Sequence, residues 1–218
     1  MNKSLGNVYI LGDSYSTYDG WIPEGNPFYY SKENDDEREE KSGVVRVEDT
    51  WWYKLINETN SKLVLNNSFS GSTICNTGYD GLYVPKSSFV GRFESDLNAG
   101  VFKDNAVDTI LIFGATNDSW AGSPYGEVKY DNISSEDLKS IFPATCYLLS
   151  KASKNCGNSK IIFIRNTELK KEIGETIEDI CNTLNVQMIP LDNIDKAGGH
   201  PTLAGMEEIK NQILAHLR

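Results

Sequence analysis

Apolar residues recur along the chain in short runs that predict the strands of a buried sheet. Asn7–Leu11, Lys62–Asn66 and Lys160–Arg165 are runs of this kind, Val107–Phe113 is the strongest one, and Val186–Leu191 is the last. Such uninterrupted runs are typical of strands that are covered on both faces. The pattern therefore predicts about five short strands.

Between these runs, apolar residues recur at the spacing of helices. A helix is expected from Trp51 to Ile56, where the apolar side chains share one face and either Asp49 or Thr50 can act as the N-cap. Another helix should begin near Ser134, although Pro143 is expected to bend or break it. The predicted helices after the first are 134–153, 167–184 and 201–217.

The alternation of strands and helices indicates the fold class. Strands that alternate with helices pair in parallel through right-handed crossovers, so we expect a three-layer α/β/α domain that spans residues 1–218. Residues 19–48 contain several glycines and prolines and an acidic run. We interpret them as an irregular, solvated insertion.

Composition and charge exclude several classes of protein. The chain has 218 residues, a formal net charge of -10 and 39% hydrophobic residues, which suits one core and disfavours nucleic acid as a partner. No apolar stretch is long enough for membrane insertion. The apolar run Val8–Leu11 is too short for an export signal. A cytoplasmic location is therefore expected, or a secreted one if such a signal has been removed, and the oligomeric state is left open.

Cysteine and histidine usage argues against a metal centre. The four cysteines, Cys75, Cys146, Cys156 and Cys181, lack the paired spacing of zinc ligands. Only two histidines are present, His200 and His216. We expect neither a metal nor an organic cofactor, and few candidates remain for a general base.

Polar clusters follow four of the predicted strands. Ser14 follows the first strand, 68–72 the second, Asn117 the third, and His200 the last. Ligands of open parallel sheets collect beyond the carboxyl ends of the strands. The four segments are therefore expected to converge on one rim.

Ser14 and His200 are the candidates for nucleophile and base. Ser14 lies at a strand-to-helix turn, where its hydroxyl can be exposed to a neighbouring base. His200 lies in a glycine-rich loop before the final helix, where an imidazole can accept that proton. Each also has an ordinary interpretation, because serine often caps a helix and a loop histidine often lies at the surface.

Asn117 and Gly71 are candidates for stabilising an oxyanion. The Asn117 amide can reach over the sheet edge and donate a hydrogen bond, and Gly71 can bring its backbone N–H close because it has no side chain. Alternatively, Asn117 is a turn residue and Gly71 belongs to a plain flexible loop.

Taken in order, Gly12-Asp13-Ser14, Gly71, Asn117-Asp118 and His200-Pro201-Thr202 resemble the four blocks of the SGNH (GDSL-like) hydrolase family. The resemblance runs from residue 12 to residue 205. It implies a flavodoxin-like fold and esterase, lipase, thioesterase or carbohydrate-deacetylating activity. It also implies that Ser14 is the nucleophile of a serine esterase, that His200 is the base, and that Ser14 N–H, Gly71 N–H and Asn117 form the oxyanion hole.

Two positions depart from the family pattern. Ala115 stands where the family has a glycine two residues before the asparagine, so a slightly altered turn is expected. Ala197 stands where the family has the aspartate that orients the histidine. Asp195 is our candidate for this role, and Asp192 is an alternative, if the loop folds back. A backbone carbonyl could also hold the ring.

Aromatic residues near the expected rim suggest the substrate. The candidates are Trp21, Tyr29, Tyr30, Tyr79, Tyr83, Trp120 and Tyr125. Aromatic faces with nearby amides and carboxylates suit sugar rings, although each aromatic could equally cover the core. We expect a small-molecule ester substrate, with an acetylated carbohydrate as the leading choice and Trp120 and Tyr125 as pocket residues. The alternatives are a non-catalytic carbohydrate-binding or scaffold domain on the same fold, and an acyltransferase.

Overall fold

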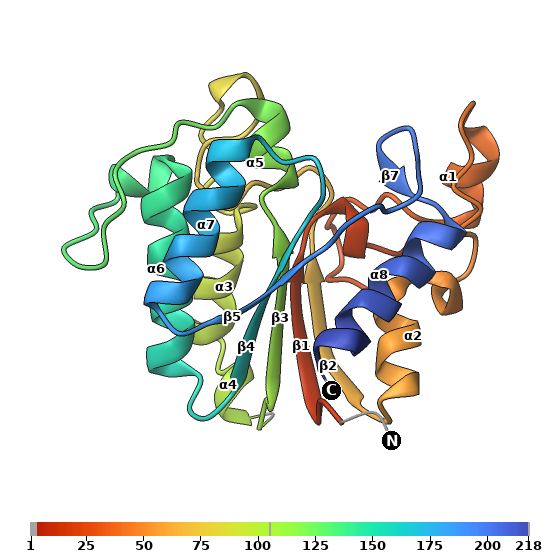
Figure 1. Ribbon diagram of the computed structural model, residues 1–218, viewed down its shortest axis with the longest axis horizontal. Helices are drawn as coiled ribbons and strands as arrows, with labels where there is room; N and C mark the ends of the chain where they lie inside the picture. Colours follow the sequence, from red (N-terminus) through yellow and green to blue (C-terminus); the bar gives the residue numbers. More distant parts are fainter. Residues whose placement is uncertain (1–3, 105, 218) are drawn as a thin grey trace.

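A parallel sheet of five strands lies at the centre of the molecule (Figure 1). The computed structural model describes residues 4–104 and 106–217, so the first three residues of the N-terminal segment discussed above lie outside it. The strand order is β2-β1-β3-β4-β5, which is the flavodoxin-like order of a doubly wound sheet. The expected fold class is thus confirmed. The strands are β1 (Asn7–Gly12), β2 (Lys62–Ser68), β3 (Thr109–Gly114), β4 (Lys160–Arg165) and β5 (Gln187–Pro190).

Helices cover both faces of the sheet (Figure 1). One face carries α3 (Phe89–Asn98), α6 (Ile141–Asn155) and α7 (Lys171–Thr183), and the other carries α2 (Trp51–Glu58) and α8 (Leu203–His216). The shorter helices are α1 (Lys32–Glu37), α4 (Val101–Asp104) and α5 (Thr116–Ala121).

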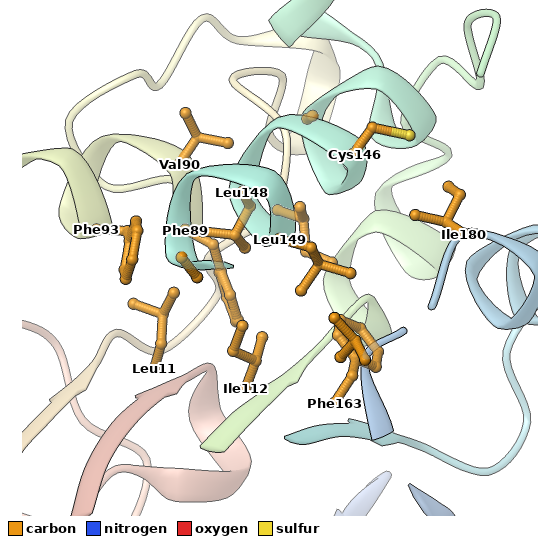
Figure 2. Packing of buried hydrophobic residues seen from close by; sticks show 14 of the residues in the cluster. Leu11, Phe89, Val90, Phe93, Ile112, Cys146, Leu148, Leu149, Phe163 and Ile180 are labelled. Carbon is orange, nitrogen blue, oxygen red and sulfur yellow. The ribbon is translucent and has the colours of Figure 1, made fainter. Parts of the chain in front are cut away.

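The core is divided by the sheet into two hydrophobic clusters. Leu11 belongs to the cluster under α3, α6 and α7, and its neighbour Ile10 belongs to the cluster under α2 and α8, because successive side chains of a strand point to opposite faces. Figure 2 shows Leu11, Ile112 and Phe163 of three strands meeting side chains of the first group of helices. Both layers are needed to bury these strands, and this explains their uninterrupted apolar sequences.

Several helices differ from the sequence prediction. The helix expected from Ser134 begins at Ile141, after a short 3-10 helix at Asp137–Lys139. Pro143 therefore lies in the first turn of α6, where its missing N–H has no intrahelical partner to lose, and it does not break the helix. Helix α7 begins at Lys171 and not at Thr167, and α3 was not predicted.

The segment read as an irregular insertion is partly ordered into a helix. Residues 32–37 form α1, whose N-cap Ser31 accepts a hydrogen bond from Asn34 N–H. The closing helix α8 begins at Leu203, because Pro201 pairs with Lys196 in a small antiparallel hairpin. In Figure 1 this hairpin, labelled at β7, lies near α1 above the sheet.

The carboxyl ends of the central strands lie side by side at one edge of the sheet. Gly12, the last residue of β1, pairs with Ser68 of β2 and with Phe113 of β3. The loops that follow these three strands therefore leave the sheet at the same level. No helix within residues 4–104 and 106–217 combines the length and the apolar character that crossing a membrane requires.

Candidate active site

Ser14 lies directly beyond β1, on a short 3-10 helix (Ser14–Ser16). The carboxylate of Asp13 starts this helix by accepting a 3.0 Å hydrogen bond from Tyr15 N–H. The Ser14 carbonyl accepts a 2.9 Å hydrogen bond from Thr17 Oγ1, which closes the turn. Ser14 is only 2% exposed, so its hydroxyl lies below the surface of the molecule.

His200 is carried by the hairpin of β6 (Lys196–Ala197) and β7 (His200–Pro201). The two turn residues, Gly198 and Gly199, have φ values of +53° and +75°. A two-residue hairpin with both central residues in the left-handed region favours glycine at both positions. The glycine pair therefore allows the tight reversal that brings His200 over the sheet edge.

The structure brings Ser14 and His200 into hydrogen-bond contact. Nε2 of His200 lies 2.9 Å from Ser14 Oγ, although the two residues are 186 positions apart in the sequence. Nδ1 of the same ring lies 3.1 Å from the Gly198 carbonyl oxygen. Since a carbonyl can only accept, Nδ1 carries the proton and Nε2 is free to accept one from the serine hydroxyl. This tautomer is the one that a general base requires.

Aromatic rings surround the imidazole. Tyr29 stacks on it with ring centroids 3.5 Å apart and an interplanar angle of 6°. Trp120 and Tyr15 approach it at 5.8 Å and 5.3 Å. Burial lowers the pKa of His200 to about 4, the Gly198 carbonyl opposes this shift, and the positive charges of Arg38 and Lys196 add to it. The ring is therefore neutral at pH 7, as a base must be.

Asn117 lies in the first turn of α5 and is held at both ends of its amide. Its Nδ2 donates to the Ser72 carbonyl at 3.0 Å, and its Oδ1 accepts from the Tyr79 hydroxyl at 2.8 Å. One of the two amide hydrogens is thus used, and the second is available for an oxyanion. Ala115, just before this helix, has a φ of +73°, the left-handed conformation that favours glycine, so the turn is retained at a cost of about 1 kcal/mol.

The loop that carries Gly71 is anchored by two buried charged side chains. Arg92 of α3 donates from Nη2 to Ser72 Oγ at 2.9 Å and to the Gly12 carbonyl at 3.1 Å. Asp118 accepts hydrogen bonds from the N–H groups of Ile74 and Cys75. The loop and the end of β1 are therefore tied to the same guanidinium.

The backbone N–H groups of Ser14 and Gly71 make no hydrogen bond within the part of the chain that the structure describes. Gly71 has a φ of +82°, so its turn uses the conformational freedom of glycine. These two N–H groups and the Asn117 amide are the donors that the sequence predicts for an oxyanion, and each has a hydrogen to donate.

Burial also changes the ionisation of the anchoring groups. It raises the pKa of Asp13 to about 7 and that of Asp118 to about 6, in each case against the lowering effect of backbone N–H donors. It lowers the pKa of Arg92 to about 10, which the neighbouring acidic groups oppose. These residues were not singled out from the sequence. Three buried ionisable side chains, two of them just beyond β1 and β3 and one on α3, are a signal that only the structure reveals.

The structure does not bring Asp195 to the ring of His200. Its carboxylate accepts a hydrogen bond from the Thr202 hydroxyl, and its N–H donates to Glu208 at 2.7 Å. Asp192 accepts a hydrogen bond from the Asn193 side chain. The glycine turn folds so tightly that the Gly198 carbonyl already occupies Nδ1. The acceptor at Nδ1 of His200 is therefore a backbone carbonyl, which is the alternative that the sequence left open.

The two expected substrate residues have different positions. Trp120 is 47% exposed beside His200, and a side chain at Gly199 would meet its ring at 3.4 Å. Tyr125 instead stacks on Phe142 of α6 at 5.3 Å and packs against the core. The Tyr125 ring is used for packing, whereas Trp120 lies beside His200. A substrate-binding role for Trp120 stays a prediction. Within the described residues, no group of three or more His, Cys, Asp or Glu side chains could hold a metal ion.

Comparison with protein families matches residues 6–217 to GDSL-like lipases and acylhydrolases. The chain belongs to the GDSL-like lipase/acylhydrolase family. Its sheet order agrees with this membership. No curated protein matches the sequence.

Solved structures of GDSL-like proteins are similar over nearly the whole chain. A candidate GDSL-like lipase from Bacteroides ovatus is 43% identical, with a TM-score of 0.89 and 99% of each chain covered. A second one, from Bacteroides uniformis, is 39% identical, with a TM-score of 0.88 and 97% of this chain and 94% of that chain covered.

A more distant likeness concerns the fold alone. A family two carbohydrate esterase from Clostridium thermocellum, solved in complex with cellohexaose, is 14% identical with a TM-score of 0.64. This likeness covers 100% of the present chain but 65% of the esterase, so the esterase contains additional chain.

Proposed function

We propose that this GDSL-like protein is a serine esterase that hydrolyses esters of small acyl groups through an acyl-serine intermediate. The observation that carries the proposal is the 2.9 Å contact between Ser14 Oγ and a His200 ring whose other nitrogen is held by the Gly198 carbonyl. Because the ring is neutral and correctly oriented, it can take the proton of the attacking hydroxyl without rearrangement.

In the proposed cycle, Ser14 Oγ bonds to the ester carbonyl carbon while its proton moves to Nε2 of His200. The negative charge develops on the former carbonyl oxygen, toward which Ser14 N–H, Gly71 N–H and the Asn117 amide can donate. The carbon–oxygen bond to the alcohol then breaks, and the alcohol leaves with the proton from Nε2. Water attacks the acyl-serine with the same base, which releases the acid and restores Ser14.

The surroundings of the site support a small acyl group and a carbohydrate alcohol. Ser14 is almost completely buried, and we take this to favour a small acyl group. Trp120 lies beside His200 and Tyr79 is hydrogen-bonded to Asn117, and both aromatic rings are partly exposed. Such rings suit the apolar faces of sugars, and a family two carbohydrate esterase with bound cellohexaose shares the fold. We therefore propose an acetylated carbohydrate as substrate.

A covalent serine probe tests the nucleophile. A fluorophosphonate should label the wild type and Ser16→Ala but not Ser14→Ala. Ser16 is a matched control, because it lies in the same turn and its buried hydroxyl has no hydrogen-bond partner within the described residues. Equal labelling of Ser14→Ala would refute the proposed nucleophile. If no protein is labelled and Ser14→Ala binds acetylated sugars as tightly as the wild type, the chain is a binding domain.

A substrate panel tests the acyl and alcohol classes. Acetylated sugars should be cleaved faster than octanoyl aryl esters, and Trp120→Ala should raise KM for the sugars more than for phenyl acetate. Partition of the acyl group between water and added alcohols then separates hydrolysis from acyl transfer. Preference for the octanoyl ester would contradict the small-acyl assignment.

A further inference from the structure

The stacked partner of the catalytic ring comes from the segment between β1 and α2. Tyr29 lies flat on His200 at 3.5 Å. Its backbone N–H donates to Thr17 Oγ1 at 2.8 Å, and its carbonyl accepts from Asn34 Nδ2 at 3.2 Å. Tyr29 is thus fixed independently of the histidine that it covers.

Arg38 completes a three-layer stack. Its guanidinium carbon lies 3.6 Å from the centroid of the Tyr29 ring. His200 already covers one face of that ring at a similar distance, so Arg38 must lie on the other face. Nη2 of Arg38 also donates to the Tyr29 carbonyl at 2.6 Å. The guanidinium therefore binds both the ring and the backbone of Tyr29.

Glu40 holds the turn that carries the base. Its carboxylate accepts a hydrogen bond from Gly198 N–H, and the Gly198 carbonyl in turn accepts from Nδ1 of His200. Across the turn, the Tyr15 hydroxyl donates to the Gly199 carbonyl. Two side chains from the first third of the chain thus restrain both glycines.

The loop around Glu40 is itself closed by a buried carboxylate. Asp35 is 3% exposed and accepts hydrogen bonds from Ser42 N–H at 2.8 Å and Ser42 Oγ at 2.7 Å. This contact joins α1 to the loop that follows it. It explains how a segment rich in charge and glycine can present Glu40 at a defined place beside the hairpin.

We propose that Tyr29, Arg38 and Glu40 form a positioning unit for His200, which takes over the orienting task of a carboxylate bound to the ring. The unit rests on the proposed function, because it serves the same serine–histidine pair. Tyr29 fixes the plane of the ring, Arg38 fixes Tyr29, and Glu40 fixes the peptide whose carbonyl binds Nδ1. None of the three has to contact the substrate.

The charged groups around the His200 ring include no carboxylate that binds and orients it within the described residues. Arg38 and Lys196 are cations near His200, and Lys196 forms a 2.9 Å ion pair with Glu168. Glu40 acts on the Gly198 peptide, and Tyr15 and Tyr29 are neutral phenols against the ring. No carboxylate within the described residues is hydrogen-bonded to Nδ1 or Nε2 of His200. An imidazole without such a partner depends on its neighbours for geometry, and a displacement of about 1 Å can cost 10²-fold in rate.

Kinetics of matched variants test the unit. Tyr29→Leu removes the stacked ring and should lower kcat on phenyl acetate by about tenfold or more with little change in KM. Tyr29→Phe keeps the ring and should recover most of this loss. Glu40→Ala should lower kcat, and Glu40→Gln, whose amide oxygen can still accept from Gly198 N–H, should recover part of the lost kcat. Glu39→Ala removes the neighbouring negative charge and serves as the control. Thermal unfolding of each variant checks that the fold is intact.

NMR titration of the imidazoles supplies a readout that does not require turnover. The chain has two histidines, so His216 in α8 is an internal reference. In Tyr29→Leu the His200 ring is more exposed, so its pKa should rise toward 6.5, the ordinary value of histidine. In Tyr29→Phe the pKa of His200 should equal that of the wild type. If Tyr29→Leu changes neither kcat nor the His200 titration, the positioning unit is refuted. If the wild type cleaves no ester but the titration responds as described, the proposed function fails and the positioning unit stands.

Discussion

The Tyr79 hydroxyl donates a 2.8 Å hydrogen bond to Oδ1 of Asn117. Because Nδ2 of the same amide donates to the Ser72 carbonyl, the two contacts fix the orientation of the Asn117 amide. An amide in the opposite orientation would present an oxygen to the developing oxyanion and repel it. Tyr79 is therefore expected to act through Asn117.

Tyr79→Phe should lower kcat by about tenfold, the loss expected from one hydrogen bond that orients a donor. Asn117→Ala should lower it by about 10²–10³-fold, as for other side-chain oxyanion donors. In the Asn117→Ala background, Tyr79→Phe should cost nothing further, and a double-mutant cycle on phenyl acetate measures this. Tyr83→Phe is the control, because the ring and not the hydroxyl of Tyr83 faces Lys139. Additive losses would contradict the coupling.

Asp195→Asn should leave kcat and its pH dependence within about twofold of the wild type, because the carboxylate contacts Thr202 and not the ring. Thr202 caps α8 by accepting from Gly205 N–H, so the same change should lower the free energy of unfolding by up to about 1 kcal/mol. Parallel assays of turnover and urea unfolding separate the two effects. A tenfold loss of kcat without loss of stability would restore Asp195 to the mechanism.

The sequence was sufficient to predict the central sheet and the convergence of the loops at its edge. Buried parallel strands need uninterrupted apolar runs, and the five runs became β1 to β5. Ser14 and Asn117 follow β1 and β3 at the same edge of the sheet, and His200 lies in the hairpin after β5. Their convergence follows from topology, which a sequence pattern does encode.

The contacts that depend on tertiary packing could not be predicted. The Gly198 carbonyl reaches Nδ1 because two left-handed glycines reverse the chain. From the sequence, with Ala197 at the family's aspartate position, Asp195 was the candidate and a backbone carbonyl only an alternative. Tyr29 was noted only as one of several aromatics, and the acidic run after it looked like a solvated surface. Its stacking on His200 depends on how α1 and the hairpin pack, which no local spacing records.

The pH dependence of kcat/KM follows from the state of His200. Its pKa is lowered to about 4, so the base is neutral above that pH and becomes protonated as the pH falls through it. Activity on an acid-stable ester should therefore be nearly constant from pH 8 down to about 5 and decline below that. His216→Gln should give the same profile. A half-maximal rate near pH 6.5 would mean that the ring is solvated and that its burial is not maintained in solution.

Asp13→Asn should change how stability depends on pH. Burial raises the pKa of Asp13 from 3.8 to about 7, so between these values the folded protein binds a proton that the unfolded chain has released. The contribution of Asp13 to folding is therefore greatest below pH 4 and is lost as the pH rises through 7. Asn cannot ionise, so the fall in the free energy of unfolding between pH 5 and pH 8 should be smaller in Asp13→Asn than in the wild type.

Urea denaturation at pH 5 and pH 8 measures this difference. Asp137→Asn is the control, because hydrogen bonds from Lys129 and Ser134 lower the pKa of Asp137 to about 2, and its ionisation does not change in this range. Equal pH dependence in the wild type and Asp13→Asn would show that Asp13 is already ionised at pH 5. In that case a charge next to Ser14 would have to be balanced by Arg92, the buried guanidinium bound to the Gly12 carbonyl.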